Sequence, residues 1–264
     1  MKFWWQRLRQ SYYLTRLAIG VALVLLHVLL VMVPDTAFLN GVRVDHISLS
    51  EWIGFNGSQQ FALAFFLILP LTASLGVGLI LLEDLTSGFS LRVLGNTRIH
   101  YLPRLLTLTF LDGFMTGALP LAIDAFFAVL YFPNLAADLV LNRSLINPKV
   151  TFFSALAFHR PLQLMIVYIL IVGCGAGLFA LMGCLFGAVF QNVYLDLAGP
   201  LIVTLILTVA AEVFPKVIVS PDAVIAPMSP NFLPEFRVVV IGFIVSLIAM
   251  IGGITSIAKA KTQI

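Results

Sequence analysis

Six long apolar stretches constrain this chain more than any other feature of its sequence. They cover residues 17–33, 58–82, 105–132, 162–190, 197–214 and 238–258. Each is long enough to cross the hydrocarbon core of a bilayer as a helix. The sequence therefore predicts an all-α membrane protein with six transmembrane helices. We expect the first helix to end at Pro34 and Pro70 to kink the second.

The composition agrees with this fold class and limits the domain organisation. Hydrophobic residues make up 61% of the chain and charged residues 10%, whereas about a quarter of a soluble domain is charged. We expect one six-helix membrane domain over residues 17–264, preceded by a short segment, residues 1–16. The first apolar stretch is too long for a signal-peptide core and lacks a small-residue cleavage site, so no cleavable signal peptide is expected.

The N-terminal segment, residues 1–16, mixes aromatic and basic side chains. A helical projection places Trp4, Trp5, Leu8 and Tyr12 on one stripe. This pattern predicts an interfacial amphipathic helix on the inner leaflet. Its basic side would face lipid phosphates and comprises Lys2, Arg7, Arg9 and Arg16. The alternative is an ordinary basic flank of the first span.

The distribution of basic residues predicts the orientation in the membrane. Nine of the fifteen Lys and Arg residues fall in segments that we assign to the cytoplasm, including both termini and residues 83–104. Residues 34–57 and 133–161 then form outer loops. Residues 215–237 are apolar and rich in proline, so we expect a loop or short hairpin dipping into the outer leaflet between helices five and six. The basic residues lie at span ends, which favours membrane lipids as partners and excludes nucleic acid.

Two of the spans carry rows of polar residues. In the third span, Asp112, Thr116 and Asp124 fall on one side of the helical projection. The fifth span has a similar row at a spacing of four, made of Asp196, Pro200, Thr204, Thr208 and Glu212. A carboxylate in the hydrocarbon costs roughly 3 kcal/mol on insertion scales, so these faces must meet other helices or water.

These rows allow two interpretations. The first is a substrate pathway for cationic or amphipathic cargo, with the two rows lining a seam between the third and fifth spans. The second is that the polar groups join helices by hydrogen bonds and never touch substrate. Asp112 and Asp196 lie nearer the inner interface, where solvation alone accommodates them. His27, deep in the first span, is a candidate for the pathway, but a hydrogen bond to a neighbouring helix is favoured.

Small residues dominate one side of the fourth span and predict close helix packing there. The side includes two Gly-x-x-x-Gly pairs, Gly173 with Gly177 and Gly183 with Gly187. The two cysteines, Cys174 and Cys184, are ten positions apart on this helix and cannot form a disulfide with each other. We expect both to be reduced.

Motifs of catalysis are absent from the sequence. It has no His-Glu-x-x-His, no cysteine pair at metal-binding spacing, no nucleotide-binding Walker motif and no Gly-x-Ser-x-Gly. We therefore expect no catalytic residues, no metal and no cofactor, and we expect that the chain is not an enzyme.

The longest polar interruption of the apolar sequence is residues 83–104. An acidic pair, Glu83-Asp84, is followed by Ser87-Gly88 and by a basic stretch that includes Arg92 and Arg98. Alone, this loop would be a positive-inside anchor. Together with six spans, a basic aromatic N-terminal segment and a proline-rich outer segment, it resembles the permease subunits of ABC-2-type ATP-binding-cassette exporters.

This resemblance implies a function and a set of partners. In that family the loop between spans two and three contains a coupling helix that docks on a separate ATPase subunit. The residues that would transmit movement are Glu83, Asp84, Ser87, Gly88, Arg92 and Arg98. The loop is shorter than usual for the family and lacks the proline often found before its basic pair.

By the same resemblance, two permease copies, or this chain and a sister permease, would enclose the pathway in a bacterial plasma membrane. The exported compound would be a peptide or an amphipathic molecule. The alternatives are a non-transporting immunity or sensory membrane subunit and, third, an unrecognised intramembrane enzyme.

Overall fold

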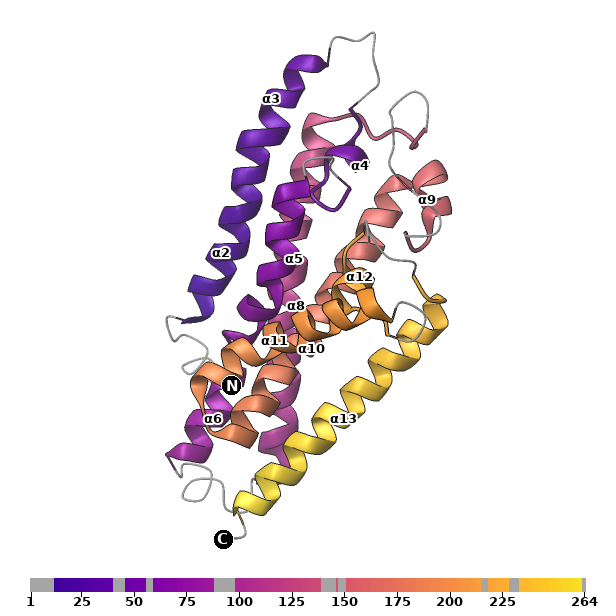
Figure 1. Ribbon diagram of the computed structural model, residues 1–264. Coiled ribbons are helices and arrows are strands. Elements are labelled where there is room, and N and C mark those ends of the chain that lie inside the picture. The colour runs from indigo at the N-terminus through magenta and orange to yellow at the C-terminus, as the bar shows by residue number, and fades with distance from the viewer. Residues whose placement is uncertain are drawn as a thin grey trace.

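The computed structural model describes residues 12–39, 46–55, 59–87, 98–138, 146, 151–214, 218–227 and 233–262. These residues form an elongated helical bundle (Figure 1) in which six helices are long and apolar enough to cross a membrane. The all-α membrane fold is confirmed. Residues 1–11 of the predicted interfacial helix lie outside the described part of the chain.

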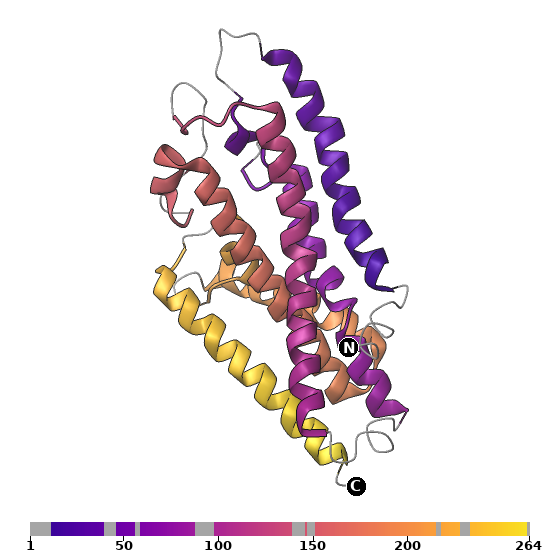
Figure 2. The same cartoon turned by 180° about the vertical axis from the view of Figure 1, so that it is seen from behind.

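Two long helices form the centre of the bundle. They are α8 (Arg98–Tyr131) and α10 (Pro161–Phe190), which make the most extensive helix contact of the described structure. Gly113 and Gly117 of α8 permit this contact, since a Cβ at Gly113 would stand 2.6 Å from the Ala176 carbonyl oxygen. The short connection after α10 and the C-terminal end of the chain lie at one end of the bundle with α6, while α4 and α9 lie toward the other (Figures 1 and 2).

The first span is longer than predicted. It begins as α2 (Tyr12–His27) and passes through a π-helical turn, Val28–Met32. It then continues as α3 (Val33–Asp35) and a 3-10 turn, Thr36–Phe38. Pro34 was expected to end this helix, but proline keeps a helical φ and removes only one donor, so the helix passes through it.

The second span is two helices instead of one kinked helix. α5 (Gln59–Ser74) and α6 (Gly78–Thr86) are separated by a break at residues 75–77. Pro70 was the expected kink. The break lies one turn beyond it, where the Ser74 hydroxyl donates to the Pro70 carbonyl oxygen at 2.7 Å. A hydroxyl that bonds to the carbonyl one turn earlier often bends or weakens a helix, which favours a break at this point.

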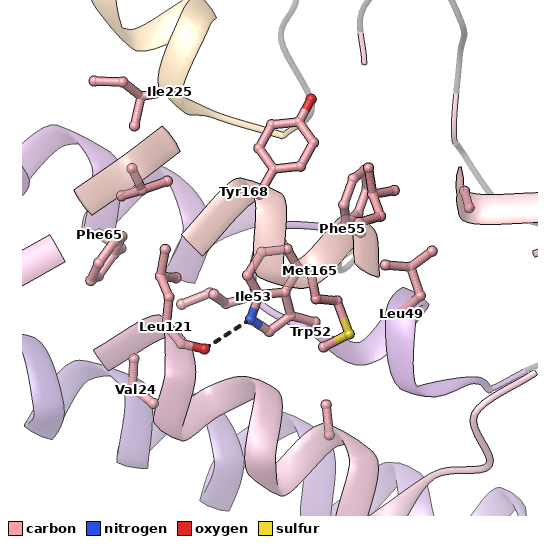
Figure 3. Close-up of a cluster of buried hydrophobic side chains, with 14 of the residues drawn as sticks. Val24, Leu49, Trp52, Ile53, Phe55, Phe65, Leu121, Met165, Tyr168 and Ile225 are labelled. Atoms are coloured by element: carbon pink, nitrogen blue, oxygen red, sulfur yellow. Dashed lines mark hydrogen bonds between the residues drawn. The ribbon is translucent and has the colours of Figure 1, made fainter. Parts of the chain in front are cut away.

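The predicted outer loop 34–57 contains a segment that packs inside the bundle. Residues 46–55 include α4 (Ser48–Glu51), and Trp52 and Ile53 after it are buried. The Trp52 indole nitrogen donates to the Leu121 carbonyl of α8 at 3.2 Å (Figure 3). The expectation of a simple external loop was wrong here, because apolar side chains such as Leu49 and Phe55 gain more from burial than from exposure.

The remaining elements follow the predicted order. α9 (Ser154–His159) lies in the second outer segment and leads into α10. α11 (Val193–Val213) begins after a two-residue turn, with the Asn192 side-chain oxygen accepting from the Tyr194 amide at 2.8 Å. α13 (Phe236–Thr262) packs mainly along α10 and exposes most of its surface (Figure 2, yellow).

The described residues of the proline-rich segment, 218–227 and 233–237, include a short helix that packs against the bundle, and the position of the segment in the outer leaflet stays a prediction. Its short helix α12 (Pro221–Ile225) is capped by the Ser220 hydroxyl, which accepts from the Ala223 amide at 3.2 Å. Ile225 packs against Gly175, near the midpoint of α10: a Cβ there would stand 2.6 Å from the Ile225 side chain. Within its described residues, the segment has no helix long enough to form a seventh span.

Candidate functional site

The polar face of α8 is buried, as its helical projection predicts. Thr109, Asp112, Thr116 and Asp124 all lie against other elements. The threonine hydroxyls donate to backbone carbonyls one turn earlier, which satisfies them without a partner helix. The two carboxylates bind groups from elsewhere in the chain, at two different levels of the bundle.

Asp124 joins three elements near the end of the bundle where α4 lies. Its Oδ1 lies 2.9 Å from His27 Nδ1, and its Oδ2 accepts from the Ile53 amide at 2.7 Å. Both side chains of the His–Asp pair are fully buried. Asp124 thus ties the first span and the packed outer segment to α8, and the predicted hydrogen bond of His27 to a neighbouring helix is confirmed.

Asp112 joins three elements at the break in the second span. It forms an ion pair with Arg16 of α2, and its Oδ2 accepts from the Val77 amide at 3.0 Å. Val77 is the residue before α6, so the carboxylate satisfies one of the free amides at that helix start. The ion pair with Arg16 and the hydrogen bond from the Val77 amide offset part of the free-energy cost of burying the two charges.

Two predictions about this level of the bundle were wrong. Arg16 was assigned to the basic side of an interfacial helix, but it belongs to α2 and is 1% exposed. Asp112 was expected to be accommodated by solvation near the inner interface, but it is buried in a pair with Arg16. A guanidinium and a carboxylate that meet inside the bundle neutralise each other, which neither sequence position reveals by itself.

The end of α6 is bound to the beginning of α8. Asp84 is buried and its carboxylate accepts from the Tyr101 hydroxyl. Glu83 and Ser87 beside it are exposed. Of the other predicted coupling residues, Gly88 and Arg92 lie outside the described residues, and Arg98 is the first residue of α8.

The polar residues of the fifth span differ in burial and in hydrogen bonding. Asp196 is fully buried, and neither carboxylate oxygen has a hydrogen-bond partner within the described chain. Thr204 donates to the Pro200 carbonyl at 2.8 Å. Thr208 donates to Asp222 of α12 at 2.7 Å, whereas Glu212 is exposed at the end of α11. The expected solvation of Asp196 at the inner interface was wrong.

The two polar rows do not line a common seam in this structure. α11 packs against α10 and against both halves of the second span, more than against α8. Asp112, Asp124 and His27 have partners within the protein instead. A role for these groups in a substrate pathway stays a prediction.

The glycine face of α10 packs against two neighbouring helices, α8 and α11, and the predicted close packing is confirmed. Gly173 and Gly177 lie under the Phe114 and Phe110 rings of α8. Gly183 and Gly187 accommodate Asp196, whose Oδ1 would stand 2.9 Å from a Cβ at Gly183. Both cysteines of this helix are free thiols.

A second polar group lies in the outer segments. His46 Nδ1 is 2.7 Å from Glu51 Oε1, and Asp35 at the end of α3 is close to both. Burial raises the pKa of the Glu51 carboxyl above its ordinary value, and the hydrogen bond from His46 opposes that shift in part. Sequence reasoning missed this group because its three members share no recognised spacing.

These observations define the class of the protein as a multi-pass helical membrane protein with buried acid-centred contacts between its helices. Comparison of the chain with protein-family models, with curated proteins and with solved structures finds no match. The function of the chain is therefore inferred from the residues and contacts described above.

Proposed function

We propose that this chain is the permease subunit of an ATP-driven exporter of the ABC-2 type. It would act as a dimer, or with a sister permease, in a bacterial plasma membrane with both termini in the cytoplasm, and separate ATPase subunits would hydrolyse ATP. Six spans and a proline-rich outer segment that dips beside α10 support this layout. The exported compound would be a peptide or another amphipathic molecule.

The observation that carries the proposal is the bond between Asp84 and Tyr101. It joins the end of α6 to the beginning of α8 immediately before the loop that resembles a coupling loop. A force applied to that loop would therefore reach both helices together. Glu83 and Ser87 are exposed at the same end and accessible to a soluble partner.

The break in the second span supports the same mechanism. Residues 75–77 interrupt the helix, so α6 can move relative to α5 without bending a continuous helix. Asp112 holds the start of α6, and Arg16 connects that carboxylate to the first span. Movement of α6 would thus be coupled to α8 and α2.

The proposal is tested by purifying the tagged chain in mild detergent from its native cells. We expect an ATPase subunit with a Walker motif to copurify in a stable complex that hydrolyses ATP. Glu83→Gln should keep the complex assembled but uncouple hydrolysis from transport, because it alters an exposed residue and no internal contact of the described structure. Glu235→Gln, an exposed acid elsewhere, is the matched control.

The outcomes separate the proposed function from its alternatives. A chain that purifies without any nucleotide-binding subunit would contradict the exporter and favour an immunity or sensory role. If Glu83→Gln couples ATP hydrolysis to transport as well as the wild type does, the proposed role of Glu83 is wrong.

A further inference from the structure

Asp35, His46 and Glu51 bring three potential metal ligands together from separate parts of the chain. Asp35 ends α3, His46 begins the packed outer segment and Glu51 ends α4. One ligand atom from each residue lies within 4.8 Å of the others. The set offers one imidazole nitrogen and two carboxylates.

The surroundings hold the His46 and Glu51 side chains in place. The His46 ring stacks on Phe38, with ring centroids 5.9 Å apart, and contacts Phe132 at 6.3 Å. The Ser50 hydroxyl bonds to the Ile47 carbonyl at 3.0 Å and lies 3.4 Å from Glu51 Oε1. The imidazole of His46 and the carboxylate of Glu51 are therefore positioned before any ion arrives, which lowers the ordering cost of binding.

The charge balance of the group calls for a cation. Glu51 is 6% exposed, and a second carboxylate, Asp35, lies beside it. Two ionised carboxylates in a poorly hydrated site repel each other and lose solvation. The His46 imidazole offers a ring nitrogen as a ligand, and a divalent ion would neutralise both acids.

We propose that Asp35, His46 and Glu51 form a binding site for a divalent transition-metal ion, with Zn²⁺ as the best-fitting ion. Zinc takes histidine nitrogen and carboxylate oxygen together, usually with four ligands, so water would complete the shell. Calcium and magnesium prefer all-oxygen sites and gain little from an imidazole. The bound ion would fasten the outer end of the first span to the segment that carries Trp52 and Ile53.

The test uses the full chain in detergent or nanodiscs after chelator treatment, titrated with ZnCl₂ against a chromophoric chelator. We expect one zinc ion per chain and an increase in the thermal unfolding midpoint on binding. His46→Ala and Asp35→Asn should each weaken binding more than about tenfold, because loss of a direct ligand exceeds the effect of an outer-shell change. Excess Ca²⁺ or Mg²⁺ should not displace the ion.

The matched controls are His159→Ala, which removes an exposed histidine of α9, and Glu235→Gln, which removes an exposed acid. Both should bind zinc as the wild type does. Co²⁺ provides a second measurement on the unaltered chain, since direct coordination gives visible absorption bands that competing zinc removes. Absence of stoichiometric binding, equal loss in His159→Ala, or unchanged binding in His46→Ala would each overturn the proposal. None of these results depends on an ATPase partner.

Discussion

At the scale of single residues, the buried acids of this protein differ in what surrounds them. Asp124 bonds to His27 and to the Ile53 amide, while Asp196 has no hydrogen-bond partner in the described chain. A buried polar group is costly chiefly when its partner is lost or missing. The same substitution should therefore have opposite consequences at the two positions.

Asp124→Asn is expected to destabilise the protein by about 1–3 kcal/mol, because a charged acceptor makes stronger hydrogen bonds than a neutral amide and only one of the two amide atoms can still accept. The effect can be measured as a lowered unfolding midpoint in detergent, with the exposed Glu235→Gln as control. An unchanged midpoint would mean that the contacts to His27 and Ile53 contribute nothing to stability.

Asp196→Asn is expected to leave the unfolding midpoint unchanged or higher. The asparagine is nearly isosteric, so it fits against Gly183 and Gly187, and it removes a carboxylate that has no compensating bond. The same thermal measurement applies. A drop as large as that of Asp124→Asn would contradict this account of Asp196.

At the scale of elements, the second span is the most unusual part of the bundle. Its break at residues 75–77 frees backbone groups that a continuous helix would satisfy, and Asp112 accepts the amide of Val77 at that point. Gly76 lies against the guanidinium of Arg16 and the carboxylate of Asp112, so the ion pair fits only because this position has no Cβ.

Gly76→Ala is therefore expected to displace the Arg16–Asp112 pair and to lower the unfolding midpoint. A broken buried pair costs about 3–5 kcal/mol, which sets the upper limit of the effect. Gly242→Ala is the matched control, because a Cβ there meets nothing within 4 Å and alanine favours a helix. Equal midpoints for the two variants would show that the pair does not depend on the space at Gly76.

At the scale of the whole molecule, the connections between the helices lie at the two ends of the bundle. α6 and the C-terminal end of α13 share one end, while α4 and α9 lie toward the other (Figure 1). The positive-inside distribution predicts that the first of these ends faces the cytoplasm. The proposed coupling to an ATPase requires the same orientation.

Ser87→Cys, in a background with Cys174 and Cys184 replaced by serine, is expected to resist a membrane-impermeant maleimide on intact cells and to react after permeabilisation. Both Ser87 and Ala155 are exposed. Ala155→Cys, at the opposite end, should react on intact cells and is the control. Labelling of Ser87→Cys on intact cells would reverse the orientation and exclude the proposed coupling.

Sequence patterns predicted the parts of the fold that depend on the average environment of a segment. The six spans, the buried polar face of α8 and the close packing at Gly173 and Gly177 follow from hydrophobicity and residue size repeated at helical spacing. For Asp112 and Asp124, the sequence predicts that each carboxylate needs a partner, because a charge within the membrane is costly. It does not predict which residue that partner is.

By itself, the sequence determined that this is a helical membrane protein with six spans, because every apolar stretch of sufficient length must pair its backbone within the bilayer. Only the tertiary structure decided that Arg16 meets Asp112, that the second span breaks after Ser74, and that Trp52 packs inside the bundle. These features join residues tens of positions apart. They depend on which helices pack together, and local sequence patterns do not predict that.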